Sequence, residues 1–386
     1  MSSTDRYCVY PFNYPHIGHQ GTPALCCNNA EYKLPYNIRT DRLIDIWHSP
    51  EAQAVRDQFQ SGGIPAGCEF CTVPESQGVR SFRQKTLGNL NRNVPFADYK
   101  IHALDLRIGN ACNLACIMCS SNSSIQLWRK LPELAENYGW SSESLAHITK
   151  RTSPELQDWS QHESSWENIY SSIGSDLRHV YIAGGEPFYV NNFEDILHRM
   201  MMVAPNARYV INSNGTRLFP AKDLNRFSGR KLAIRLSIDG LAGMDEYIRQ
   251  GTEWEHKVAV MRQYHQHFEI ECWDLTLNSL CVRKAPELIT WLQTEFPDVK
   301  INVRPVVNNR PMQLYRIPDT LRADVLQWFL DHRELAWGSD NVINELRKPY
   351  QEHKQKLRQV VGYWDKQGNN TLAELDSELA QWLWSE

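Results

Sequence analysis

From about residue 100 onward, short apolar runs alternate with helical stretches, and this alternation constrains the fold more than any other feature. The runs are rich in Val, Ile, Leu and Tyr and are bounded by turn-forming residues, as is typical of buried strands. The expected strands are residues 102–108, 178–183, 208–212, 232–238, 273–280 and 299–305. The expected helices are residues 192–203, 221–227, parts of 241–268, and 285–295. Strands separated by helices predict an α/β fold with a parallel sheet.

The two ends of the chain do not share this pattern. Residues 1–98 are loop-rich, with prolines spread throughout, and residues 120–176 form a long polar insertion between the first two expected strands. Insertions of this length are commonly functional or peripheral. Beyond residue 312, apolar residues at three- and four-residue steps predict helices over 320–334, 341–363 and 371–384. The sequence therefore predicts three regions: 1–98, 99–312 and 313–386.

Three cysteines follow the first expected strand in the run Cys112-Asn-Leu-Ala-Cys116-Ile-Met-Cys119. The spacing supplies three thiolates from one short loop and no fourth, whereas a closed structural zinc site uses four ligands. Three thiolates would leave one iron of a 4Fe–4S cubane open to a ligand from outside the protein. The spacing alone leaves three other interpretations open: buried reduced cysteines, one face of a helix, and zinc with a distant fourth ligand.

Further segments place glycines and small polar residues at or just beyond the ends of expected strands, and an arginine follows twelve residues after Ser237. The carboxyl ends of parallel strands are where βα barrels hold their ligands. Glycines permit close backbone approach, and the fork of an arginine can grip a carboxylate through two hydrogen bonds. The residues concerned are Gly184, Gly185, Glu186, Pro187, Ser213, Asn214, Ser237, Asp239 and Arg249.

The cysteine loop and these segments, in this order, closely resemble the radical S-adenosylmethionine (SAM) enzymes. The resemblance implies a partial (β/α)6 TIM-like barrel in which the catalytic residues Cys112, Cys116 and Cys119 bind a 4Fe–4S cluster. It also implies that SAM chelates the open iron and that an electron from the cluster splits the sulfonium to give a 5′-deoxyadenosyl radical.

The same resemblance assigns the segments above to SAM binding. In the family, the Gly-Gly-Glu-Pro segment contacts the methionyl amino group. In related peptide-modifying members, a serine and an arginine at positions such as those of Ser237 and Arg249 hold the SAM carboxylate and ribose. One residue departs from the pattern: the position before the last cysteine is usually aromatic, and here it is Met118. Methionine is bulky and polarizable, so we expect Met118 to line the adenine side of the pocket.

Composition favours a soluble, cytoplasmic protein. The net charge of −4 gives no electrostatic reason to expect a nucleic-acid partner. The sequence shows neither a signal segment nor a stretch long enough to cross a membrane. In the cytoplasm, ten cysteines are not expected to form disulfides, so metal binding is the leading use for the clustered ones.

The N-terminal region contains a second cysteine group. Cys8, Gly21 and Cys26 fit the pattern Cys-x12-Gly-x4-Cys, and Cys68 and Cys71 follow as Cys-x2-Cys. This pattern resembles the auxiliary-cluster domain called SPASM, or its shorter relative called twitch, although those domains usually follow the barrel. The resemblance implies one auxiliary 4Fe–4S cluster on these four thiolates. Structural zinc uses similar spacings, and Cys27 could replace Cys26 as a ligand.

A radical SAM enzyme with an auxiliary cluster is expected to abstract a hydrogen atom from its substrate. Relatives of this kind most often modify peptides. The leading hypothesis is therefore oxidative or bond-forming modification of a peptide or protein, with flavodoxin or ferredoxin as the electron donor. A small-molecule dehydrogenase or cyclase is the second hypothesis. The third is a non-catalytic, metal-bound binding scaffold, against which the residues of the SAM site argue.

Overall fold

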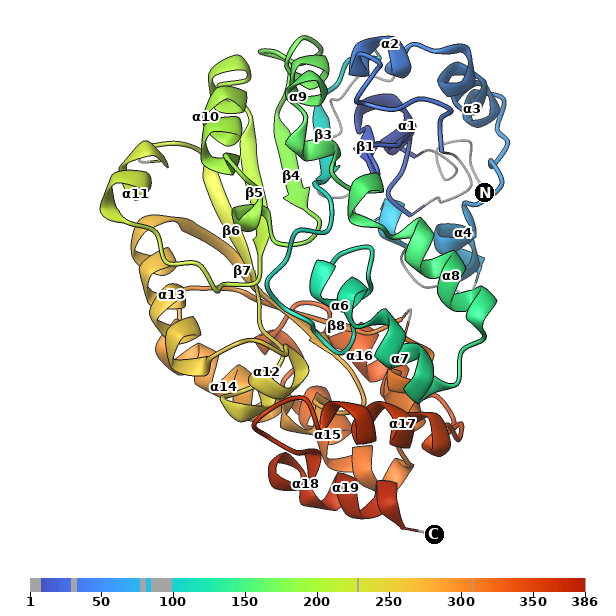
Figure 1. Ribbon diagram of the computed structural model, residues 1–386, viewed down its shortest axis with the longest axis vertical. Coiled ribbons are helices and arrows are strands. Elements are labelled where there is room, and N and C mark those ends of the chain that lie inside the picture. Colours follow the sequence, from blue (N-terminus) through green and yellow to red (C-terminus); the bar gives the residue numbers. More distant parts are fainter. Residues whose placement is uncertain are drawn as a thin grey trace. The chain divides into compact units, whose positions relative to one another are not determined.

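The strands expected from residue 100 onward are present in a computed structural model, with helices between them (Figure 1). The structure describes residues 8–28, 33–76, 81–84, 99–227, 229–307 and 309–385. The chain divides into two compact units, each assembled from separate segments. The first unit comprises Met1–Ala111, Pro154–Ile211 and Arg226–Leu232, and the second comprises Cys112–Ser153, Asn212–Asn225 and Ala233–Glu386. The expected region boundary at residue 98 lies outside the described residues.

Among the residues that the structure describes, the first unit holds five strands, of which three were expected. Its strands are β1 (His16–Ile17), β2 (Pro23–Ala24), β3 (Ala103–Arg107), β4 (His179–Ala183) and β5 (Arg208–Ser213), although the last two residues of β5 belong to the second unit. The order is β2-β1-β3-β4-β5, antiparallel between β2 and β1 and parallel elsewhere. The expected strands match β3, β4 and β5 to within one residue. β1 and β2 were not expected because two-residue strands are too short to show a period.

The first unit also contains helices. They are α1 (Tyr10–Asn13), α2 (Leu43–Trp47), α3 (Pro50–Gln60), α4 (Glu69–Ser76), α9 (Glu163–Tyr170) and α10 (Phe193–Val203). Both α2 and α10 pack against α9. The start of α3 follows from local chemistry, since the Ser49 side chain accepts a hydrogen bond from the Ala52 N–H and Pro50 occupies the first turn. Strand residues such as Leu104 and Ile182 are buried, as is Leu197 of α10.

The second unit holds β6 (Leu232–Ser237), except for its first residue, and β7 (Glu269–Leu277) and β8 (Ile301–Pro305), all parallel. β7 begins at Glu269 instead of the expected residue 273. Its first residues alternate polar and apolar side chains, and the Glu271 carboxylate lies 2.9 Å from the Arg235 guanidinium of β6. This cross-strand ion pair extends the strand beyond its apolar core.

The helices of the second unit include two with the expected bounds, α11 (Ala221–Phe227), which runs two residues into the first unit, and α14 (Ala285–Glu295). The prediction of one continuous helix over 341–363 is wrong. The structure has two helices there: α16 (Ser339–Leu346) ends before Pro349, and α17 (Lys354–Trp364) begins after it. Proline lacks an N–H and restricts the residue before it. The other helices are α6 (Ile125–Arg129), α7 (Leu131–Tyr138), α8 (Ser142–Arg151), α12 (Gly243–Ile248), α13 (Trp254–His267), α15 (Asp319–Asp331), α16 (Ser339–Leu346), α17 (Lys354–Trp364), α18 (Leu372–Leu375) and α19 (Ser377–Trp384).

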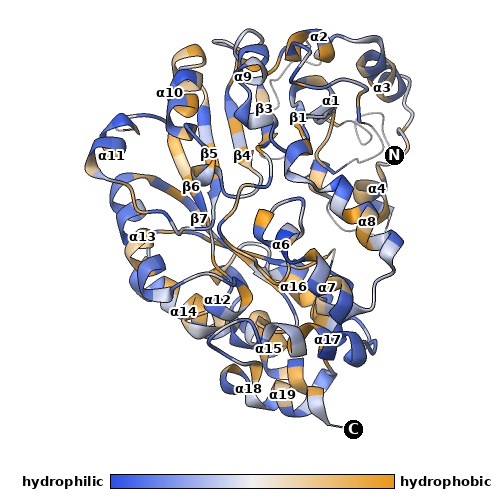
Figure 2. Ribbon diagram, in the orientation of Figure 1, coloured by the Kyte–Doolittle hydropathy of each residue, from blue (hydrophilic) through white to orange (hydrophobic). Residues whose placement is uncertain are grey.

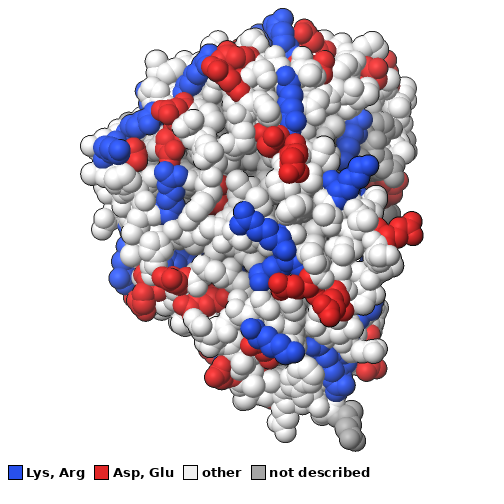
Figure 3. Space-filling model, viewed as in Figure 1, with Lys and Arg blue, Asp and Glu red and all other residues white. Residues whose placement is uncertain are grey.

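The exposed side chains include charged residues of both signs. The outward helix α11 is mainly hydrophilic in Figure 2, and basic and acidic side chains lie interspersed on the face shown in Figure 3. One surface pair joins Arg199 and Glu167, whose side chains are about half exposed. Within the described residues, none of the helices combines the length and the apolar character needed to cross a bilayer.

Candidate active site

The cysteine loop of the second unit is held by the backbone that carries Arg249. The Ala115 N–H donates to the Gln250 carbonyl and the Ile117 N–H donates to the Ile248 carbonyl, both at 2.9 Å. Gly251 follows with a φ of +98° and packs closely against Leu114, a conformation and contact that favour glycine. These contacts hold the cysteine loop against the backbone segment formed by residues 248–251.

The three cysteines of this loop differ in exposure. Cys116 is buried, Cys112 is half-buried and Cys119 is exposed. The Cys119 N–H donates to the Cys116 carbonyl at 3.0 Å, which closes a turn between these two residues. Burial raises the pKa of the Cys116 thiol to about 12, against the opposing effect of Arg249. A bound metal would therefore have to displace the Cys116 proton.

No three histidine, cysteine or carboxylate side chains among the described residues are arranged to hold one metal ion. A cubane cluster makes a different demand, because each thiolate binds a separate iron atom. The donor set fits such a cluster in chemistry: three thiolates come from one loop, and a buried cation lies beside the loop.

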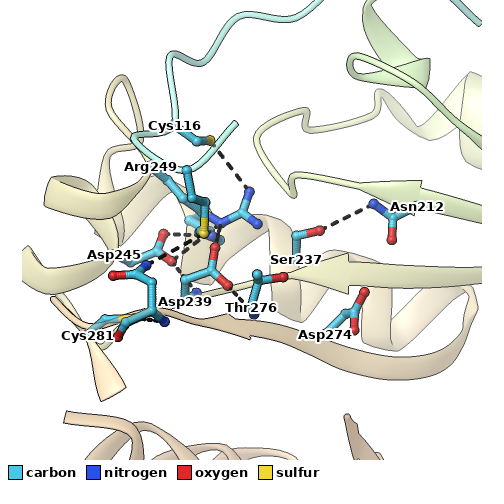
Figure 4. Close-up of polar contacts among 12 residues, drawn as sticks. Cys116, Asn212, Ser237, Asp239, Asp245, Arg249, Asp274, Thr276 and Cys281 are labelled. Carbon is cyan, nitrogen blue, oxygen red and sulfur yellow. Dashed lines mark hydrogen bonds and ion pairs between the residues drawn. The ribbon is translucent and has the colours of Figure 1, made fainter. Parts of the chain in front are cut away.

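The cation beside the loop is Arg249, and a buried carboxylate fixes it (Figure 4). Its Nε lies 2.6 Å from Asp239 Oδ2, and its Nη1 lies 3.9 Å from Cys116 Sγ. The other oxygen of Asp239 accepts the Thr276 N–H at 2.6 Å. Burial acts to lower the pKa of Arg249, but Asp239 and Cys116 outweigh it and the pKa is raised. The guanidinium is therefore a permanent charge next to Cys116.

Two residues that the sequence did not single out complete this network. Lys257 Nζ lies 2.6 Å from Asp245 Oδ2, and both side chains are fully buried. The other Asp245 oxygen accepts the Asp239 N–H at 2.9 Å and lies 4.0 Å from Arg249 Nε. Two carboxylates thus balance two cations. In the sequence, only the position of Asp245 four residues before Arg249 suggests that the two side chains interact. Lys257 looks like any other lysine on a helix, so the sequence gives no indication of its role.

The end of β5 contributes Asn214 to the same site. Its Nδ2 lies 2.9 Å from Asn113 Oδ1 and 3.8 Å from Cys112 Sγ, and its Oδ1 accepts the Thr216 N–H at 3.1 Å. Ser213 serves the turn instead, since its hydroxyl accepts the Gly215 N–H. Asn214 is therefore placed to orient Cys112.

Ser237 and Met118 complete the residues of the second unit that were expected to bind SAM. The Ser237 hydroxyl accepts a long hydrogen bond of 3.4 Å from Asn212 Nδ2. Met118 is half-buried, and its sulfur lies 3.6 Å from Asn278 Nδ2. Asn278 was not predicted; its side chain also accepts the Leu280 N–H. Cys281 and Cys272 are also buried.

The Gly-Gly-Glu-Pro segment lies in the first unit, where it packs on the residues that lead to Cys112. The Gly185 N–H donates to Gly109 and the Glu186 N–H donates to Ala111. A Cβ on Gly185 would lie 2.2 Å from the Ala111 oxygen, so no larger residue fits without movement. The Glu186 side chain is buried and accepts the Phe188 N–H, next to Pro187 in the following turn.

The four N-terminal cysteines of the predicted auxiliary site line one cavity in the first unit. Cys8, Cys26, Cys68 and Cys71 share it with apolar side chains that include Phe59 and Phe70. Burial and the neighbouring thiols raise the pKa of Cys8. Cys27 is not among the lining residues; its thiol interacts with Cys26 and with Asp105. The geometry therefore favours Cys26 over Cys27 as the ligand.

Comparison with known proteins identifies this N-terminal segment. Residues 8–73 match SPASM, an iron–sulfur cluster-binding domain, which favours iron–sulfur over zinc and agrees with the predicted placement before the barrel. No curated protein matches the chain.

Among solved structures, anSMEcpe with bound AdoMet is 12% identical over 60% of each chain, with a TM-score of 0.38. SuiB from Streptococcus suis is 10% identical over 83% of this chain and 68% of its own, with a TM-score of 0.37. Coproporphyrinogen III oxidase (HemN) from Escherichia coli, a radical SAM enzyme, is 11% identical over 57% of this chain and 49% of its own, with a TM-score of 0.36.

The matched region spans about 60% of the length of anSMEcpe. The chain is similar to the SPASM iron–sulfur domain over residues 8–73 and is structurally similar to radical SAM enzymes.

Proposed function

We propose that this chain is a radical SAM enzyme that carries an auxiliary 4Fe–4S cluster and modifies a peptide or protein by oxidation or bond formation. When bound, a 4Fe–4S cluster on Cys112, Cys116 and Cys119 together with SAM would supply one-electron reductive cleavage, a 5′-deoxyadenosyl radical and hydrogen-atom abstraction from the substrate. The protein binds, orients and shields these groups.

The observation that carries this proposal is the position of Arg249. Its guanidinium is held by Asp239 on one side and lies 3.9 Å from Cys116 Sγ on the other. A buried cation at this place stabilises a cysteine thiolate and offers donors to an anionic group of a ligand beside it. A scaffold that only bound metal would have no use for a buried arginine fixed so closely to one ligand.

The remaining residues take roles around this centre. Asn214 orients Cys112, Ser237 offers a hydroxyl near the same end of the parallel strands, and Met118 lines the pocket. The resemblance assigns the SAM carboxylate and ribose to Ser237 and Arg249, and the methionyl amino group to the Gly184–Pro187 segment. Asp239 acts through Arg249 as a positioning residue, because Arg249 and the Thr276 N–H already use its two oxygens.

The auxiliary cluster would be held by Cys8, Cys26, Cys68 and Cys71. Aromatic and aliphatic side chains share the lining of this cavity with the cysteines and would shield the ligated sulfurs from water. The match of residues 8–73 to an iron–sulfur domain supports this assignment. The substrate class rests on the SPASM resemblance, since relatives with such clusters most often act on peptides.

Anaerobic reconstitution tests the chemistry. The parent protein should bind about eight irons per chain and release 5′-deoxyadenosine when dithionite and SAM are added. Cys116→Ala should lose about four irons and all 5′-deoxyadenosine. Cys68→Ala is the matched control, since it should lose about four irons and still cleave SAM. A parent protein with full iron and no 5′-deoxyadenosine would instead be a metal-bound scaffold.

The substrate class needs a separate experiment. A short peptide encoded beside the gene for this chain should lose two hydrogen atoms for each oxidation or new bond, as measured by mass spectrometry. Reduced flavodoxin or ferredoxin should replace dithionite as the electron donor, and Cys116→Ala should leave the peptide unchanged. Oxidation of a small alcohol with no change in the peptide would favour the small-molecule enzyme.

A further inference from the structure

The C-terminal helices contact the segment that carries Arg249. Asp365 follows the last residue of α17, and its Oδ1 accepts the Tyr247 hydroxyl at 2.8 Å and the Leu372 N–H at 3.0 Å. Tyr247 is 1% exposed and lies two residues before Arg249. One carboxylate oxygen therefore joins the end of α17, the start of α18 and the end of α12.

Two further contacts tie the same parts of the second unit together. Asn370 Nδ2 donates to Glu246 Oε2 at 3.1 Å. On the other side of Arg249, Gln250 packs against Gly368 so closely that a Cβ there would lie 2.9 Å from Gln250 Nε2. The loop between α17 and α18 thus contacts residues on both sides of Arg249.

This segment in turn holds the cysteine loop. The carbonyls of Ile248 and Gln250 accept the N–H groups of Ile117 and Ala115. Any shift of residues 247–250 would therefore move the guanidinium of Arg249 and the backbone on either side of Cys116 at the same time.

We propose that residues 364–372 form a C-terminal brace that sets the position of Arg249 and of the cysteine loop, with Tyr247 and Asp365 as its positioning residues. Neither residue touches the reacting groups. Both act through the backbone of residues 248–250, which holds the cysteine loop. The proposal rests on the proposed function only where SAM affinity is the readout, because the order of the loop can be measured without SAM.

A matched pair of substitutions isolates the brace. Tyr363 also is buried and also donates its hydroxyl to a carboxylate at 2.8 Å, but its partner is Glu133 on α7 and not α12. Tyr247→Phe and Tyr363→Phe therefore remove the same kind of bond from the same C-terminal region. We expect both variants to lower the midpoint of thermal unfolding to a similar extent.

Only Tyr247→Phe should change the site. Amide hydrogen exchange, followed by mass spectrometry on peptides that cover residues 113–119, should be about tenfold faster in Tyr247→Phe than in the parent and unchanged in Tyr363→Phe. In reconstituted protein, the Kd for SAM should rise about tenfold in Tyr247→Phe alone. Asp365→Ala should reproduce Tyr247→Phe, and Asp365→Asn, which keeps the acceptor oxygen, should restore most of the protection.

The outcomes separate this proposal from the proposed function. Equal exchange in the two tyrosine variants, whether both fast or both slow, would overturn the brace. A parent protein that binds no SAM, together with faster exchange only in Tyr247→Phe and Asp365→Ala, would support the brace and refute the proposed function. If Tyr247→Phe does not fold, the pair Asp365→Ala and Asp365→Asn decides between the same outcomes.

Discussion

Removing the charge of Asp105 should weaken the contact between strands β1 and β3 and lower the stability of the chain. Asp105 lies in β3, opposite His16 of β1 in the parallel register. One oxygen lies 3.3 Å from Arg107 Nε and the other 3.4 Å from His16 Nδ1, and the Asp105 side chain is 7% exposed. Burial opposes ionisation of this carboxyl, but Arg107 and His16 outweigh it and hold its pKa below the ordinary value.

The size of the effect follows from burial on the two sides of the pair. Breaking a fully buried ion pair costs about 3–5 kcal/mol, and an exposed pair contributes about 0–1 kcal/mol. Arg107 is 26% exposed and can recover part of its hydration when Asp105 is lost. We therefore expect Asp105→Asn to lower the free energy of unfolding by about 2 kcal/mol at pH 7.

The dependence on pH gives the sharper test. A carboxyl whose pKa is lower in the folded state contributes stability above its unfolded pKa of about 3.9. This contribution is lost as pH falls through the folded value. Urea unfolding of the metal-free chain should therefore give a free energy of unfolding that differs between the parent and Asp105→Asn. This difference should be largest at pH 6–7 and should shrink below about pH 4.

Glu167→Gln is the matched control, because its pair with Arg199 is about half exposed on both sides. That substitution should cost less than about 1 kcal/mol. A cost for Asp105→Asn no larger than that of the control, or a difference that stays constant down to pH 3, would refute the reasoning.

Other substitutions test the cavity and the buried contacts. Cys26→Ala should remove the auxiliary iron, as measured by iron analysis and electron paramagnetic resonance, and Cys27→Ala should keep it; the reverse result would exchange their roles. Gly185→Ala should lower the free energy of unfolding by about 1–3 kcal/mol because its Cβ meets the Ala111 oxygen, whereas Gly174→Ala, with nothing within 4 Å, should not. Lys257→Ala should cost about 3 kcal/mol or more in urea unfolding because Asp245 loses its fully buried ion-pair partner, and a loss as small as that of the surface variant Lys284→Ala would contradict this.

The strands and helices from residue 100 onward could be predicted because residues that form turns or begin helices occur where these elements start and end. Pro220 precedes α11, and proline is common where a helix begins. By contrast, β1 has two residues and depends on its partner β3 for its conformation, so no local pattern reveals it. Pro349 marks the interruption between α16 and α17. Apolar residues keep their helical spacing on both sides of it, so the sequence predicted one continuous helix.

In the candidate site, residues within motifs could be predicted and the residues that support them could not. Cys116 and Arg249 could be predicted because both lie in the segments that resemble the family's motifs. Lys257 belongs to a helix with other charged residues, and only the tertiary structure shows that its side chain is buried. The contact between Tyr247 and Asp365 joins positions far apart in the chain, and nothing near either residue indicates its partner.

The unequal exposure of the three loop cysteines bears on how the protein must be handled. Cys119 is exposed while Cys116 is buried. An oxidant that reaches the loop would meet the exposed Cys119 first, and a sulfenic acid there would remove one of the three proposed ligands while Cys116 stayed intact. Brief contact with air should therefore leave a chain that is correctly folded yet unable to assemble the proposed cluster until a thiol reductant returns the Cys119 sulfenic acid to the thiol.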